Sequence, residues 1–97
     1  MLQLYNEEPI AIFMNNRRRI KIDFCNVRME LKMCQFFQFS NYLFMKSRKI
    51  NQDTDQVNLH LVQKNLSIII SLNHFLQLLH GVQVVVSNIK GNVIISE

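Results

Sequence analysis

The two cysteines and three histidines of this sequence are of types that commonly bind metals or act as nucleophiles or bases. They are Cys25, Cys34, His60, His74 and His80. Their spacing matches no recognised pattern of zinc ligands, which come in closely spaced pairs. His74 and His80 are six residues apart, so a helix would place them on nearly opposite faces. We therefore expect neither a metal site nor a cofactor.

Cys34 stands where the sequence predicts the start of a helix, a position that favours the reactive thiolate form of cysteine. A catalytic thiol also needs a nearby base, and the carboxylates nearest in sequence, Asp23 and Glu30, form no convincing set with it. The chain also lacks a glycine-rich phosphate loop, a carboxylate pair in an apolar setting and a defensible serine, histidine and aspartate arrangement. We interpret Cys34 as a half-buried structural residue and predict that the protein is not an enzyme.

The predicted hairpin excludes a disulfide between Cys25 and Cys34. About eight extended residues separate them, roughly 25 Å, whereas a disulfide requires Cα atoms within about 7 Å. Two cysteines are also too few for a disulfide-stabilised scaffold. The first residues, MLQLYNEEPIAIF, lack the pattern of a signal peptide, so the cytoplasm is the expected location.

Positive charge is concentrated in the first half of the chain. Residues 1–50 contain nine Lys/Arg and four Asp/Glu, a net charge of +5, whereas residues 51–97 contain two and three, a net charge of −1. A two-stranded ribbon that carries cations can contact nucleic-acid phosphates. However, Asp23 and Glu30 share the outer face of the ribbon, where opposite charges across strands stabilise a sheet, and no aromatic residue is interleaved there for base stacking. The candidate anion-binding residues are Arg17, Arg18, Arg19, Lys21, Arg28 and Lys32.

The elements that would position these residues begin with a β-hairpin. Met1–Glu8 has the character of a loose lead-in, and a short apolar run typical of a strand follows it. Apolar and polar residues then alternate in Arg18–Phe24 and again in Val27–Met33, on either side of the turn candidate Cys25-Asn26. Two alternating runs around a short turn predict a hairpin.

A helix and a polar connection follow this hairpin. In CQFFQFSNYLFMK, Phe36, Phe39 and Leu43 recur with the spacing of one helix face. The pattern lasts about three turns, a usual helix length. Residues 47–56, SRKINQDTDQ, have the composition of a connection between units.

The same order of patterns recurs in the second half. Val57–Leu61 and Leu66–Leu72 alternate around a turn signal, and a helical pattern opens at Asn73. An offset of 39 residues aligns the second strand and the helix start of the two halves, and an offset of 37 aligns the first strand. The second turn should therefore be two residues longer. We predict two hairpin–helix (ββα) units, at about 18–46 and 57–89, that arise from duplication or from a shared plan.

The end of the chain has two interpretations. In the preferred one, a helix continues from His74 to Ile89, with Gly91 near its C-terminus, where glycine is favoured, and with Val93–Ile95 as a final strand or tail. In the other, the helix is short and residues 82–97 form a hairpin, because the β-branched run Val84–Val86 favours a strand.

Together these patterns predict an α+β fold, in which both units form one mainly antiparallel sheet with the helices on one face. Leu66–Val86 has no charged residue and is long enough to cross a bilayer. It contains seven polar side chains, however, which would be costly in hydrocarbon. A strand followed by a buried helix explains the same residues without that cost. We expect one domain of residues 1–97 and no membrane span.

The outer face of the second predicted hairpin is uncharged. Alternation places on it Asn58, His60, Val62, Ser67, Ile69 and Ser71. A face of this kind with two apolar side chains needs cover, either from another molecule or from a terminal segment of the same chain. We expect Val62 and Ile69 to be interface residues if another molecule provides the cover.

Ile20–Phe39, IKIDFCNVRMELKMCQFFQF, resembles a pattern found in small bacterial proteins of unknown function, in which a hairpin with an asparagine-containing turn precedes a helix. Those helices usually open with acidic residues, whereas the openings here are CQFFQF and NHFLQL. The resemblance implies the fold and no activity. We predict a non-enzymatic protein–protein interaction module that is a homodimer or part of a larger assembly. The alternative is a nucleic-acid-binding accessory protein that uses the basic first hairpin.

Overall fold

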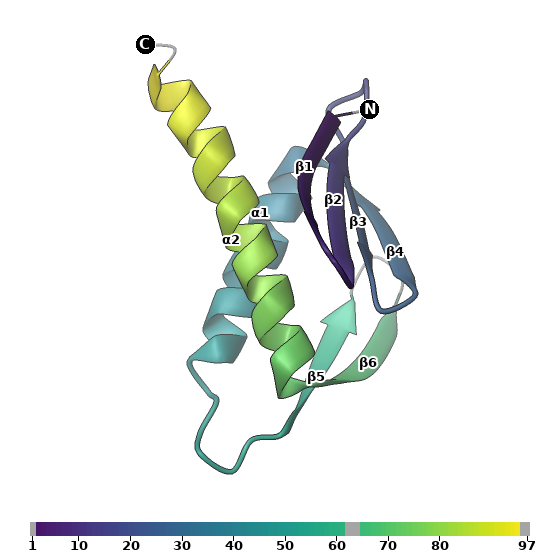
Figure 1. Ribbon diagram of the computed structural model, residues 1–97, viewed down its shortest axis with the longest axis vertical. Coiled ribbons are helices and arrows are strands. Elements are labelled where there is room, and N and C mark those ends of the chain that lie inside the picture. Colours follow the sequence, from purple (N-terminus) through teal and green to yellow (C-terminus); the bar gives the residue numbers. More distant parts are fainter. Residues whose placement is uncertain (1, 62–64, 96–97) are drawn as a thin grey trace.

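The protein has an α+β fold (Figure 1), which confirms the predicted class. The structure is a computed structural model that describes residues 2–61 and 65–95, with side chains as far as residue 91. Six strands and two helices lie within these residues. In chain order they are β1 (Leu2–Glu7), β2 (Ile10–Met14), β3 (Ile20–Phe24), β4 (Val27–Leu31), α1 (Met33–Ser47), β5 (Gln56–Leu61), β6 (Leu66–Ser71) and α2 (Leu72–Ile95).

The first four strands form one antiparallel sheet in the order β1-β2-β3-β4. The prediction of a loose lead-in over Met1–Glu8 is wrong, because β1 pairs with β2 along its length. A register irregularity between Gln3 and Tyr5 interrupts β1. Such a bulge breaks the period of two by which a strand is identified in a sequence, so this strand escaped the periodicity analysis.

The turn between β3 and β4 has the predicted position and chemistry. Cys25 and Asn26 have φ values of 47° and 66°, and two positive φ values in succession are typical of the type I′ turn of a two-residue hairpin. The register runs from Phe24 opposite Val27 to Ile20 opposite Leu31. The alternation of the sequence therefore matches the inner and outer faces of this hairpin.

β5 and β6 form a separate two-stranded sheet, so the prediction of one shared sheet is wrong for the described strands. Leu61 pairs with Leu66, which leaves four residues between the strands, two more than in the first hairpin, as the offsets predicted. On the free edge of β5, the backbone N–H of His60 donates to Tyr42 Oη of α1 at 2.9 Å. A side chain therefore takes the hydrogen bond that a neighbouring strand would take in a continuous sheet.

The chain continues as one long helix. α2 extends through Ile95, so the predicted strand or tail at Val93–Ile95 is wrong, and Gly91 lies within the helix rather than at its end. The alternative hairpin over residues 82–97 is also wrong for the described part of that segment, which is helical.

Burial explains why α2 passes through residues that favour other structures. Val82 and Val85 are buried, and burial of this kind outweighs the modest strand preference of valine. Gly81 faces Tyr5 of β1, and a Cβ at position 81 would stand 2.8 Å from Tyr5 Cε2. The glycine weakens the helix locally but lets α2 lie close to β1.

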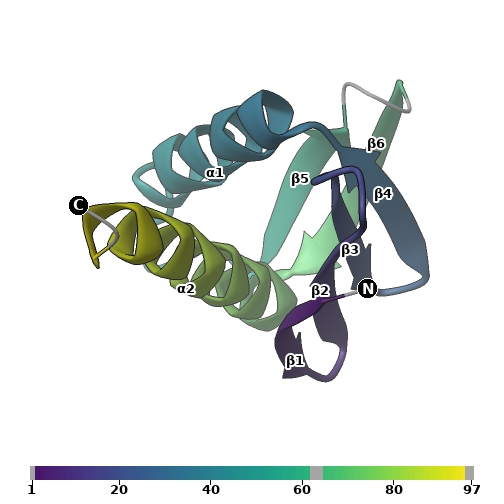
Figure 2. The same ribbon diagram turned by 90° about the horizontal axis from the view of Figure 1, so that it is seen from above.

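Both helices lie on the same side of the strands (Figure 2), and they pack against each other and against both sheets. Within the described residues, neither helix is long and apolar enough to cross a membrane. The uncharged run from residue 66 is β6 followed by the start of α2, whose inner side is buried. The largest fully buried side chains are Ile12, Ile20, Ile22, Phe24, Phe36, Leu43, Leu59, Leu61, Phe75, Leu78, Val82 and Val85.

Candidate functional site

The outer face of the β5–β6 hairpin is open to solvent. Cross-strand pairs join Asn58 to Ile69 and His60 to Ser67, and side chains of directly paired residues lie on the same face of a sheet. These four residues are exposed, as is Ser71, which shares their face by alternation. We call this uncharged surface the hairpin outer face, and define it as Asn58, His60, Ser67, Ile69 and Ser71.

Ile69 dominates the hairpin outer face. It is 67% exposed, the highest value among the exposed large hydrophobic residues of the described chain. The alternative of internal cover does not hold for the described segments: β1 pairs with β2, and α2 packs against the strands on the inner side. Val62, the other predicted interface residue, lies outside the described residues.

Hydrogen bonds hold His60 at the edge of this surface. Its backbone N–H donates to Tyr42 Oη at 2.9 Å, and its ring Nδ1 lies 3.2 Å from Ser67 Oγ. The imidazole is therefore tied across the hairpin, from β5 to β6. Ile69 is the main apolar side chain of the hairpin outer face, whose other side chains are polar.

The structure pairs half of the predicted anion-binding residues with carboxylates. Lys21 lies directly opposite Glu30, and Arg28 lies opposite Asp23. Their charged atoms are 3.9 and 3.5 Å apart, and Arg19 Nη1 stands 4.0 Å from Glu30 Oε2. This arrangement is the cross-strand charge pairing that stabilises a sheet. It reduces the net positive potential on the outer side of β3 and β4.

The remaining three predicted cations lie at one end of the four-stranded sheet. Arg17 and Arg18 occupy the loop between β2 and β3, and Lys32 precedes α1. All three are exposed. The expectation that no aromatic residue joins the basic face is wrong: Phe13 of β2 pairs directly with Lys21 and is half-buried beside it. The pairing of β2 with β3 was not predicted from the sequence, so Phe13 was not assigned to this face.

The two cysteines are free, which confirms the exclusion of a disulfide between them. Cys34 is exposed in the first turn of α1, so the prediction that it is half-buried is wrong. Cys25 is the half-buried thiol, and its Sγ lies 3.7 Å from Nδ1 of His74. Desolvation raises the pKa of Cys25, which favours the unreactive thiol.

The contact between Cys25 and His74 could not be read from the sequence, because 49 residues separate the two positions. It forms because α2 begins beside the β3–β4 turn. Ser71 Oγ accepts the backbone N–H of His74 at 3.1 Å, an N-cap bond that helps to fix the start of the helix. Within residues 2–61 and 65–95, no group of three His, Cys, Asp or Glu residues is placed to hold a metal ion.

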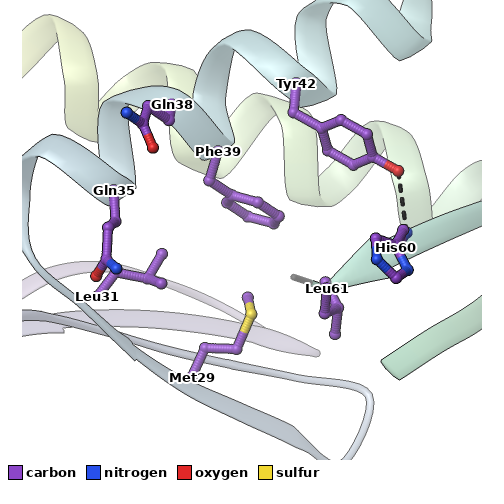
Figure 3. A pocket seen from close by; sticks show the side chains of 8 residues that line it. All are labelled: Met29, Leu31, Gln35, Gln38, Phe39, Tyr42, His60 and Leu61. Carbon is purple, nitrogen blue, oxygen red and sulfur yellow. Dashed lines mark hydrogen bonds between the residues drawn. The ribbon is translucent and has the colours of Figure 1, made fainter. Parts of the chain in front are cut away.

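A pocket of about 280 Å³ opens between α1 and the free edges of β4 and β5 (Figure 3). It lies on the helix side of the strands and meets the hairpin outer face at His60, which contributes to both. The residues that line it are Met29, Leu31, Gln35, Gln38, Phe39, Tyr42, His60 and Leu61. The pocket could not be predicted from the sequence, because it exists only where the two sheets separate.

No protein-family model, curated protein or solved structure matches this chain.

Proposed function

We propose that the protein is a non-enzymatic, cytoplasmic interaction module that self-associates through the hairpin outer face. The observation that carries this proposal is the exposure of Ile69, 67%, at the centre of an uncharged surface that no described segment covers. Burying a side chain of this size stabilises an assembly by about 1.5–3 kcal/mol. A two-fold symmetric dimer buries the same residue on both copies.

A second copy of the chain is the partner that fits this surface best. The chain has a formal net charge of +4, and like charges brought together at an interface oppose association. The hairpin outer face has no Lys, Arg, Asp or Glu, so two copies meet there without that repulsion. Its Asn58, Ser67 and Ser71 side chains supply donors and acceptors around the isoleucine, in the manner of a polar rim.

Replacing Ile69 with Lys tests the proposal. We expect the wild-type chain to elute with at least twice its monomer mass in size-exclusion chromatography with light scattering. The Ile69→Lys chain should elute as a monomer with an unchanged circular dichroism spectrum, because it places two cations at the centre of the interface.

Met45→Lys is the matched control, since Met45 is a 54% exposed apolar residue of α1 on the helix side of the molecule. This variant should keep the wild-type mass. A monomeric wild-type chain, or an equal loss of assembly in both variants, would contradict self-association through this surface.

We also propose that the fold consists of two related hairpin–helix units, at residues 18–46 and 57–89. The order β3-β4-α1 followed by β5-β6-α2 supports it. Phe36 and Phe75, which are 39 residues apart, are both fully buried at equivalent positions of their helices. The proposed units share a core but not a sheet.

The second candidate function is binding of single-stranded nucleic acid at the loop end of the four-stranded sheet. The placement of Phe13 next to Lys21 favours it, because an aromatic side chain beside cations is the arrangement on which bases stack. Arg17 and Arg18 would contact phosphates there.

Salt dependence tests this second function. Binding of a labelled single-stranded oligonucleotide should weaken as salt rises, and Arg17→Ser with Arg18→Ser should reduce the slope of log K against log salt by about 1.4. Arg48→Ser with Lys49→Ser, at the end of α1, is the matched control and should leave binding nearly unchanged. Equal losses in both variants would indicate attraction by net charge alone.

A further inference from the structure

We propose that the pocket between α1, β4 and β5 binds a small uncharged molecule with an apolar body and one hydroxyl group. The pocket lies on the helix side of the strands and its floor belongs to the apolar core, and among its lining residues it shares His60 with the hairpin outer face. The variants that test the pocket leave Ile69 and the other side chains of the hairpin outer face unchanged, so the two proposals are tested separately.

The body of the ligand follows from the floor and the size of the pocket. Met29, Leu31 and Leu61 are at most 5% exposed, and the ring of Phe39 projects over the same space from α1 (Figure 3). The volume is about 280 Å³, whereas a dry apolar cavity of about 150 Å³ binds benzene. One six-membered ring with small substituents fits this volume.

The polar group of the ligand follows from the ends of the pocket. Gln35 and Gln38 lie at one end, and Tyr42 and His60 lie at the other (Figure 3). Tyr42 Oη accepts the backbone N–H of His60, and a phenol that accepts a hydrogen bond still has its own O–H to donate. A ligand hydroxyl placed beside Tyr42 is thus offered a donor, while its apolar body covers the floor.

The charge of the ligand follows from the lining. Among the described residues that line the pocket, none is Asp, Glu, Lys or Arg. Burying an ionised group without a partner is strongly unfavourable, so an anion or cation of the same shape should be rejected. A few polar groups around an apolar floor are the usual composition of small-molecule sites.

Methionine-methyl NMR on the whole chain tests the proposal, with p-cresol as the probe. The chain has five methionines, of which Met29 lies in the pocket and Met45 is exposed elsewhere on α1. We expect the Met29 methyl signal to shift and saturate as p-cresol is added, while the Met45 signal stays in place. 4-Methylbenzoate, which has the same ring but is an anion, should bind at least tenfold more weakly.

Three variants locate the binding. Gln38→Trp fills the mouth of the pocket from an exposed helix position and should abolish the Met29 shift. Gln83→Trp is the matched control on an exposed position of α2 and should leave it unchanged. Tyr42→Phe should weaken p-cresol about fivefold, the effect of one neutral hydrogen bond, and leave toluene binding unchanged.

A Met29 shift that grows linearly without saturating would overturn the proposal. The same shift in the Gln38→Trp chain, or 4-methylbenzoate binding as well as p-cresol, would also overturn it. Because Gln38 and Gln83 are exposed, both tryptophan variants should fold, and a circular dichroism spectrum like that of the wild type checks this.

Discussion

At the scale of single residues, the contact of Cys25 with His74 shows why reactive types do not by themselves make a reactive site. A thiol and an imidazole within 3.7 Å have the composition of a nucleophile and its base. Desolvation by burial raises the pKa of Cys25, however, and the thiolate is the form that reacts. The pair is therefore better suited to packing the β3–β4 turn against α2 than to catalysis.

This raised pKa makes a prediction about alkylation. In a Cys34→Ser chain, the rate at which iodoacetamide modifies Cys25 should rise with pH to a midpoint above the ordinary thiol value of 9.0. The same chain unfolded in urea is the control, and its midpoint should return to the ordinary value. A folded midpoint below the unfolded one would mean that the thiolate is stabilised and would reopen the nucleophile hypothesis.

The same shift has a definite sign for stability. Because the pKa of Cys25 is higher in the folded chain than in the unfolded chain, its stabilising contribution is fully present below the unfolded pKa. It is lost as the pH rises through the folded pKa. Cys25→Ala should therefore flatten the alkaline decline in the free energy of unfolding relative to wild type, as measured by urea denaturation.

At the scale of elements, two glycines of α2 occupy different surroundings. Gly81 lies against the Tyr5 ring, where a Cβ would stand 2.8 Å from Tyr5 Cε2, whereas a Cβ at Gly91 would meet nothing within 4 Å. Alanine is better than glycine inside a helix by about 1 kcal/mol. The same substitution should therefore have opposite effects at the two positions.

We expect Gly91→Ala to raise the free energy of unfolding by up to about 1 kcal/mol. Gly81→Ala should lower it by about 1–3 kcal/mol, because the added methyl group overpacks the contact between α2 and β1. In a Tyr5→Ala background, Gly81→Ala should become stabilising. Urea denaturation of the four chains measures this double-mutant cycle, and the same sign for Gly81→Ala in both backgrounds would contradict the close contact.

At the scale of the whole molecule, charge and exposure differ between the two outer surfaces. The outer side of β3 and β4 has cross-strand ion pairs, whereas the hairpin outer face has no charge and an exposed isoleucine. The molecule is elongated, with extents of 44 × 25 × 23 Å, because α2 projects beyond the strands (Figure 1). Ile69 lies on the face of β6 opposite the buried Ile70, so a second copy can approach it from the side that the helices do not cover (Figure 2).

Self-association makes thermal stability depend on protein concentration. Because unfolding of an assembled chain also releases its partner, Tm should rise by about 2–4 °C for each tenfold increase in concentration. The Ile69→Lys chain should show no such rise, and Met45→Lys should behave as wild type. Differential scanning calorimetry over two decades of concentration measures the effect, and a constant wild-type Tm would count against the dimer.

The sequence by itself determined the local elements wherever side chains repeat with one clear period. Apolar and polar residues alternate in Arg18–Phe24 and Val27–Met33 because one face of that hairpin is buried and the other faces solvent. Successive residues of a strand point to opposite faces, so every second residue is apolar. The helix at Met33–Ser47 and the longer second turn followed in the same way. The absence of charge on the hairpin outer face was likewise readable, because alternation assigns each residue to a side.

Only the tertiary structure decided how these elements meet. β1 was not predicted because a bulge interrupts its alternation. Val84–Val86 is helical because burial outweighs the strand preference of valine. The strands separate into two sheets, and the pocket lies where they part, beside the bond between Tyr42 of α1 and the edge of β5. The contact of Cys25 with His74 joins positions 49 residues apart. The local period of a sequence does not show which distant residues come into contact, because those contacts form only when the elements pack together.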